Sequence, residues 1–256
     1  MSTVELHRYP DEAALADAIA ARFIAHVVSR QAATGHASVC LTGGGIGTAC
    51  LAAVAASSGR DSIDWGAIDI WWGDERYAPE GDPDRNETGA RAALLDKVRV
   101  NEANVFPIAG PDNSADVDAS AAAYAQALAS RARPDDHARV PSFDVCMLGI
   151  GPEGHVASIF PESPAAHDER VAIAVRNSPK PPPTRVSLTF PSINAAREVW
   201  ILASGEAKAQ AILDTVSGAA GPLQVPAAGV HGRERTVYLL DDAAASLLPP
   251  GTFPPL

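Results

Sequence analysis

Apolar residues recur along this chain with two periods, one typical of helices and one typical of buried strands. Residues 11–30 carry Leu15, Ile19, Phe23 and Val27 at intervals of four, which places these side chains on one face of a helix. Short continuous apolar runs are typical of strands that are buried on both faces of a parallel sheet. The pattern therefore predicts that a surface helix opens the fold and that strands and helices alternate after it.

The predicted elements extend over the whole chain. Strands are expected at residues 37–42, 68–73, 143–149, 171–175, 185–190, 199–203 and 236–240, and helices at 11–30, 46–56, 86–97, 121–131 and 206–216. This order predicts an α/β fold of three layers, α/β/α, with a mainly parallel, Rossmann-like sheet. The loop between 171–175 and 185–190 is too short for a crossover helix, so these strands should form a small antiparallel excursion. No linker divides the chain, and residues 1–256 are expected to be one domain.

An apolar run over residues 143–148 ends in a glycine-rich loop that carries two titratable side chains. Gly151 and Gly154 lie in this loop, and Glu153 and His155 stand two residues apart at its exit. Open α/β sheets bind their ligands at the carboxyl ends of the strands. Histidine is also the side chain best suited to move protons near neutral pH. We therefore expect this loop to be catalytic.

A second glycine-rich turn joins an earlier strand to a helix. It consists of Thr42, Gly43, Gly44 and Gly45, and its glycines allow backbone N–H groups to turn toward an anion at the helix N-terminus. The turn lacks the Gly-Lys-Ser/Thr sequence of a nucleotide P-loop. A plain tight turn is the alternative interpretation.

Another buried strand ends in opposite charges, at Asp74, Glu75 and Arg76. Arg76 can form paired hydrogen bonds with a phosphate while Asp74 or Glu75 holds the guanidinium in place. A surface ion pair is the alternative for this segment. Core packing is the better interpretation of the preceding Trp71 and Trp72.

Two later segments add polar side chains. Alternation along a strand places Arg185, Ser187 and Thr189 on one face, which can line a site or face water. At the next strand-to-helix turn, Ser204 is expected as the N-cap and Lys208 lies in the first helical turn. A cation at that place can meet a phosphate, and a solvated helix position is the alternative.

Residues 149–154 also match the dinucleotide-binding pattern G-x-G-x-x-G after a strand. Pro161 and Pro164 would end a following helix before it could cover the sheet. Arg176 and Asn177 stand where the acidic ribose partner would be expected. NAD(P) binding is therefore disfavoured, and the chain has neither a nucleophile-elbow nor a zinc-protease motif. We expect no cofactor and no metal.

Net charge, cysteine content and hydropathy indicate which binding partners and which cellular compartment to expect. The formal charge is −11 and no block of Lys and Arg occurs, which argues against a nucleic-acid or anionic-membrane surface. Cys40, Cys50 and Cys146 are odd in number, and the first and last lie in apolar runs typical of reduced core thiols. The chain begins without a secretory signal and has no run near the ~18 apolar residues of a spanning helix. A soluble, cytoplasmic protein is expected.

Six segments, taken in order, make the chain resemble the 6-phosphogluconolactonases. They are LTGGG (41–45), WGDERY (72–77), DRN (84–86), LGIGPEGH with SIFP (148–161), RVSLTFPSI (185–193) and SGEAKA (204–209). The resemblance covers nearly the whole chain and implies the fold shared with glucosamine-6-phosphate deaminase and ribose-5-phosphate isomerase. The chain departs from the family pattern in two places. Many members have Ser-Gly-Gly with Thr-Pro after it in the first loop, and many have Asp where this chain has Glu153.

The resemblance implies hydrolysis of 6-phospho-D-glucono-1,5-lactone to 6-phospho-D-gluconate, the second step of the oxidative pentose phosphate pathway, without metal. A monomer is expected, although the sequence does not determine the oligomeric state. His155 would activate the water, and Glu153 would orient the ring or stabilise its imidazolium form. Backbone N–H groups of the glycine-rich loops would meet the developing oxyanion. Three cations would hold the 6-phosphate. The implied substrate-binding residues are Thr42, Gly43, Gly44, Gly45, Asp74, Arg76, Gly151, Gly154, Arg185 and Lys208.

Two other functions fit parts of the sequence. An amino-sugar phosphate deaminase or aldose-ketose isomerase has the same fold, but it would carry an Asp-Glu-Tyr type sequence in place of GDER. A non-catalytic sugar-phosphate sensor would need the phosphate-binding cations but neither His155 nor a partner carboxylate. No pair of DNA-binding helices precedes the domain, which disfavours a regulator.

Overall fold

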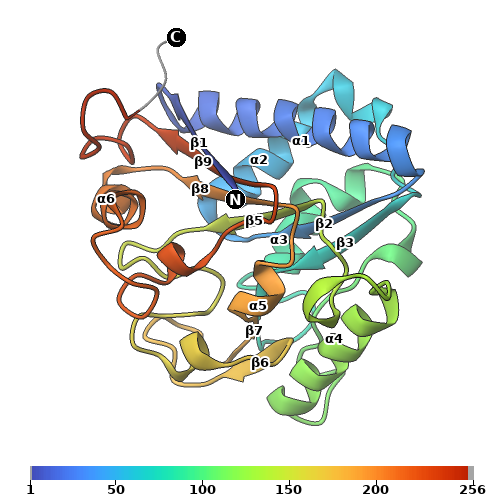
Figure 1. Cartoon of the computed structure of the whole chain (residues 1–256). Helices are drawn as coiled ribbons and strands as arrows, with labels where there is room; N and C mark the ends of the chain where they lie inside the picture. The colour runs from blue at the N-terminus through green and yellow to red at the C-terminus, as the bar shows by residue number, and fades with distance from the viewer. Residues whose placement is uncertain (1, 253–256) are drawn as a thin grey trace.

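The computed structural model describes residues 2–252 (Figure 1). The strands are β1 (Thr3–Tyr9), β2 (Ala37–Leu41), β3 (Ile68–Trp72), β4 (Asp74–Arg76), β5 (Val145–Gly149), β6 (Ala172–Val175), β7 (Arg185–Leu188), β8 (Glu198–Ala203) and β9 (Arg235–Asp241). The α-helices are α1 (Glu12–Thr34), α2 (Gly44–Ala56), α3 (Asn86–Ala93), α4 (Val117–Arg131), α5 (Phe190–Ile193) and α6 (Ala209–Ser217).

Six strands form a parallel sheet in the order β1-β9-β8-β5-β2-β3. Helices α1 and α2 cover one face of this sheet and α4 lies on the other side, which confirms the predicted three layers (Figure 1). The chain runs from β2 outward to β3, and it later runs from β5 outward through β8 to β9. The neighbouring strands β2 and β5 are thus the switch point, where such sheets bind ligands.

The antiparallel excursion is also confirmed, and it is larger than the sequence predicts. Strands β6 and β7 pair antiparallel, with Ala172 opposite Leu188. The short strand β4 joins them on the other side of β7 and completes a second, three-stranded sheet. Gly73 connects the two sheets, because its N–H donates to the Leu41 carbonyl (3.0 Å) and its carbonyl accepts from Leu188 (2.9 Å).

Two predicted elements are wrong in detail. The chain opens with strand β1, not with a helix, and this edge strand escaped prediction because its partly exposed positions carry polar side chains. The helix expected over residues 86–97 ends at Ala93, and a separate 3₁₀ turn, Leu95–Lys97, follows it.

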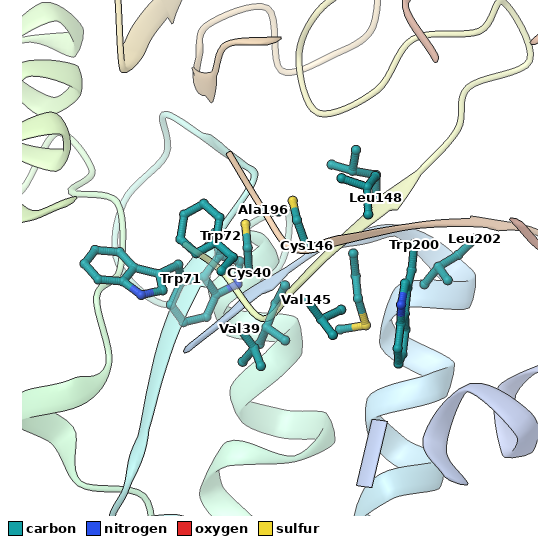
Figure 2. Close-up of a cluster of buried hydrophobic side chains, with 14 of the residues drawn as sticks. Val39, Cys40, Trp71, Trp72, Val145, Cys146, Leu148, Ala196, Trp200 and Leu202 are labelled. Carbon is teal, nitrogen blue, oxygen red and sulfur yellow. The ribbon is translucent and has the colours of Figure 1, made fainter. Parts of the chain in front are cut away.

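Large aromatic side chains and free thiols fill the core on both sides of the switch point. Cys40 of β2 lies opposite Cys146 of β5, between Trp71 and Trp72 on one side and Trp200 on the other (Figure 2). Both cysteines are free and fully buried, and burial raises the pKa of the Cys40 thiol well above its ordinary range. The expected roles of the cysteines as core thiols and of the tryptophans as core packing are confirmed. No helix within residues 2–252 is long and apolar enough to cross a membrane.

At the carboxyl end of the edge strand β3, one side chain bonds both backbone groups of Trp72. The Tyr124 hydroxyl of α4 accepts a hydrogen bond from Trp72 N (2.9 Å) and donates one to Trp72 O (2.8 Å). Replacing Tyr124 by Phe leaves both buried groups unpaired. We expect Tyr124→Phe to lower the free energy of unfolding by about 1–3 kcal/mol.

Chemical denaturation measures this loss. Tyr9→Phe is the matched control, because the Tyr9 hydroxyl has no hydrogen-bond partner among the described residues and its removal should change stability by less than ~0.5 kcal/mol. Equal stabilities of the two variants would contradict the role given to Tyr124.

Candidate active site

A cavity of about 350 Å³ opens at the carboxyl ends of β2 and β5. Gly149 N donates to Thr42 Oγ1 (3.2 Å), so the loops that follow these two strands are joined directly. The cavity brings together nearly all of the predicted site residues. Those that line it are Thr42, Gly43, Gly44, Gly45, Asp74, Arg76, Gly151, His155, Arg185 and Lys208.

His155 and Glu153 form a hydrogen-bonded pair, with Nδ1 of the imidazole 3.0 Å from Oε1 of the carboxylate. A carboxylate only accepts hydrogen bonds, so Nδ1 carries the proton and the lone pair of Nε2 remains free. The ring stacks on Phe160, with 4.5 Å between centroids. Burial lowers the pKa of His155 below its ordinary value of 6.5, although the charge of Glu153 opposes this shift. The imidazole is therefore mainly neutral at pH 7 and can accept a proton.

Glu153 does not line the cavity but supports His155 from behind. Its second oxygen, Oε2, lies 2.9 Å from Nζ of Lys180. Burial alone would raise the pKa of Glu153, but the bond from Lys180 and the neighbouring positive charges outweigh burial and lower it. Lys180 carries no recognisable signal in the sequence, because it lies in a proline-rich connection without a site motif.

Arg76 is held by a residue that the sequence analysis did not select. Its NH1 group donates to the Asp84 carbonyl (2.8 Å) and to the side-chain oxygen of Asn86. The expectation that Asp74 or Glu75 holds this guanidinium is wrong. Glu75 instead accepts from the backbone N–H groups at the start of α3. The signal for Asn86 was present in the DRN segment.

Arg185 is almost fully buried, so the interpretation that it faces water is wrong. Its Nε and NH2 groups donate to three backbone carbonyls of the loop over residues 180–182, at 3.0 to 3.2 Å. Its NH1 group lies 3.8 Å from Oδ2 of Asp74. Ser187 and Thr189 are buried as well, but they bond to backbone carbonyls and do not line the cavity.

Lys208 is half-buried, and its ammonium has no hydrogen-bond partner among the described residues. Burial lowers the pKa of Lys208, and the charge of Lys180 lowers it further. Ser204 is not the N-cap that the sequence predicts. Its hydroxyl instead contacts Asp241 Oδ2 (2.6 Å) and Glu12 Oε2 (2.9 Å). A 3₁₀ turn then carries Lys208 to the start of α6.

The N-terminus of α2 borders the same cavity. Its N-cap, Gly43, has no side chain to bond the first N–H groups, so these groups are available to an anion. A Cβ atom at Gly43 would lie 1.8 Å from Asn86 Oδ1, which explains why glycine is needed here. Among residues 2–252, no three His, Cys, Asp or Glu side chains are placed to share a metal ion.

Comparison with known proteins shows the family of this chain. The family model described as glucosamine-6-phosphate isomerases/6-phosphogluconolactonase matches residues 10–239. The chain belongs to this family. A Streptomyces coelicolor protein named 6-phosphogluconolactonase is 55% identical to it, covering 99% of this chain and 98% of the relative. A Mycobacterium tuberculosis protein of the same name is 46% identical over 97% of this chain and 99% of its own length.

Solved structures of the family share the fold. The 6-phosphogluconolactonase of Trypanosoma brucei superposes with a TM-score of 0.80 at 27% identity, covering 97% of this chain and 99% of that chain. A monomeric glucosamine-6-phosphate deaminase superposes with a TM-score of 0.78 at 19% identity, covering 95% and 99%, and this likeness shows the fold alone. The expected fold is therefore confirmed for this member of the glucosamine-6-phosphate isomerase/6-phosphogluconolactonase family.

Several residues of this family member line the cavity although the sequence analysis did not assign them to the site. Apart from Asn86, for which the DRN segment was a signal, each lies far along the chain from the loop of His155 or has a side chain without distinctive chemistry, so only the tertiary structure places it at the cavity. They are Glu12, Ile46, Asn86, Gly149, Ile150, Ala157, Leu202 and Ser204.

The loop glycines of this family member leave room for the imidazole. A Cβ atom at Gly151 would lie 1.9 Å from His155 Nδ1. Gly154, which does not line the cavity, has a φ of +85° and packs against Val225, and a Cβ atom there would lie 2.7 Å from Val225 Cγ1. Both positions therefore require glycine, the first for space and the second also for its backbone conformation.

Gly151→Ala is expected to displace the imidazole and break its bond with Glu153. The NMR signals of His155 should move, with the assignment taken from a His155→Ala spectrum. Gly89→Ala is the control, because a Cβ atom there meets only Thr48 Oγ1, at 3.7 Å. Unchanged His155 signals in Gly151→Ala would show that the loop accommodates the methyl group.

Proposed function

We propose that this chain is a 6-phosphogluconolactonase that opens 6-phospho-D-glucono-1,5-lactone with water activated by His155. The observation that carries the proposal is the His155–Glu153 pair beside a cavity bordered by three cations. The high identity to relatives named 6-phosphogluconolactonase supports the same substrate. A monomer of one domain in the cytoplasm is the form we expect to act, and the buried free cysteines support that compartment.

The lactone is an activated ester, so its hydrolysis needs a general base and a site for the oxyanion. Nε2 of His155 accepts a proton from water as the water oxygen forms a bond to C1. The carbonyl oxygen takes up the negative charge, which backbone N–H groups of the Gly44 and Gly151 loops stabilise. The C1–O5 bond then breaks, and the imidazolium returns its proton to the ring oxygen. The products are the carboxylic acid and the free hydroxyl of 6-phosphogluconate.

The three cations differ in the number of hydrogen bonds that they already donate within the protein. Two nitrogens of Arg185 donate hydrogen bonds to loop carbonyls, and Arg76 donates hydrogen bonds to Asp84 and Asn86. Lys208 is the cation at the cavity with no hydrogen-bond partner among the described residues. We therefore assign the main contact with the 6-phosphate to Lys208, with Arg76 and Arg185 adding charge at longer range.

Lactone consumption is the first test. The lactone is generated in situ, and its disappearance is followed against spontaneous hydrolysis in the presence of a chelator. We expect wild type to accelerate the reaction and His155→Ala to lose about 10²- to 10⁴-fold of that acceleration, the usual contribution of a general base. His167→Ala, which removes an exposed histidine, is the control and should retain full activity.

The outcomes separate the alternatives. Acceleration retained in His155→Ala would keep the lactonase but reject this mechanism. A wild-type protein that binds 6-phosphogluconate without accelerating hydrolysis would be a sensor. Release of ammonia from glucosamine 6-phosphate would indicate a deaminase.

Lys208→Met tests the phosphate contact. One charge-assisted hydrogen bond contributes about 1.5–3 kcal/mol, so kcat/KM for the phosphorylated lactone should fall by about 10- to 100-fold. Activity on unphosphorylated glucono-1,5-lactone should be nearly unchanged, since that substrate lacks the group. Equal losses on both substrates would show that Lys208 acts on the reacting centre or on the fold.

A further inference from the structure

Lysine is rare in this chain, yet two of its three lysines converge on one site. Lys97 lies on the surface, whereas Lys180 is close enough to Lys208 for its positive charge to lower the pKa of Lys208. Lys208 borders the cavity and Lys180 does not. Instead, the Lys180 ammonium lies 2.9 Å from Glu153 Oε2, on the side of the carboxylate away from His155. Ammonium, carboxylate and imidazole therefore form a continuous chain of polar contacts.

Hydrogen bonds from two side chains fix the backbone around Lys180. The buried Arg185 guanidinium donates to the carbonyls of Lys180 (3.1 Å), Pro181 (3.2 Å) and Pro182 (3.0 Å). The Ser178 hydroxyl also donates to the Lys180 carbonyl (3.1 Å). The Lys180 side chain is 41% exposed, but the backbone from which it extends is fixed by these hydrogen bonds. The contact between Lys180 and Glu153 therefore differs from an ion pair between two mobile surface side chains.

We propose that Lys180 is a positioning residue for the catalytic pair: it fixes the Glu153 carboxylate against His155 and offsets its charge, so that the imidazole stays neutral and able to act as a base. This inference rests on the proposed lactonase function. It also gives Arg185 a second role, because the same guanidinium that borders the cavity anchors the loop of Lys180.

The charges that face His155 determine the sign of the effect. Glu153 and Asp74 favour the imidazolium form, and Lys180 disfavours it. The Arg185 guanidinium lies over the same Phe160 ring on which His155 stacks, 5.7 Å from its centroid. Burial is the main reason that the pKa of His155 lies below 6.5. Removing the positive charge of Lys180 leaves the negative charge of Glu153 uncompensated, which raises the pKa of His155. As the pH falls, the imidazole is then protonated earlier, so activity declines at a higher pH than in wild type.

The experiment compares the pH dependence of kcat/KM for wild type, Lys180→Met, Lys180→Arg and the surface control Lys97→Met, each corrected for spontaneous hydrolysis. We expect the acid limb of Lys180→Met to move to higher pH. Its activity at pH 6 should fall by about 3- to 10-fold, the effect of losing one charge near a partly buried imidazole, while its activity at pH 8.5 stays near wild type. Lys180→Arg should restore the wild-type acid limb.

A second readout does not depend on activity. NMR titration of the His155 C2–H signal should give a higher pKa in Lys180→Met than in wild type and Lys97→Met, even if the lactone is not the substrate. An unchanged titration, a loss equal at every pH, or a raised KM alone would overturn the proposal. Thermal unfolding of each variant identifies any that fail to fold, and Lys180→Gln then replaces Lys180→Met.

Discussion

The parallel pairing of β2 with β5 is the constraint on which the site depends. Because both strands run in the same direction and lie side by side, their carboxyl ends bring two glycine-rich loops to one place. The bond from Gly149 N to Thr42 Oγ1 joins those loops directly. The N-terminus of α2 and the loop that carries His155 therefore share one cavity, although more than a hundred residues separate them along the chain.

The second sheet completes that cavity by bringing in charges that the parallel sheet lacks. Gly73 turns the chain out of β3, and the paired strands β4 and β7 then deliver Asp74, Arg76 and Arg185 to the same side. Asp74 accepts from Ser158 (2.6 Å) and lies near Arg185, so its buried charge is compensated. Although the protein is acidic overall, Arg76, Arg185 and Lys208 thus border the same cavity.

The hydrogen bond between Glu153 and His155 determines which nitrogen of the proposed base carries the proton. Glu153 fixes the tautomer of His155 and burial favours the neutral imidazole, so the lone pair of Nε2 is free near pH 7. Glu153 beside the ring favours the imidazolium form of His155, whereas the Lys180 ammonium beyond Glu153 disfavours it. The loop that carries Lys180 is anchored by Arg185, which couples the base to the wall of the cavity.

The sequence by itself determined the alternating α/β order, the antiparallel pair and most of the cavity residues, because apolar periodicity and glycine-rich strand ends are local signals. The extent of a single strand, such as the one predicted at residues 37–42, was predictable for that reason. Only the tertiary structure decided which side chains bond to one another. Arg76 bonds to Asn86 and not to Asp74, Ser204 bonds to Asp241, and Glu153 bonds to Lys180. These contacts join residues on different elements. Their distances are set by sheet order and loop path, which no local pattern encodes.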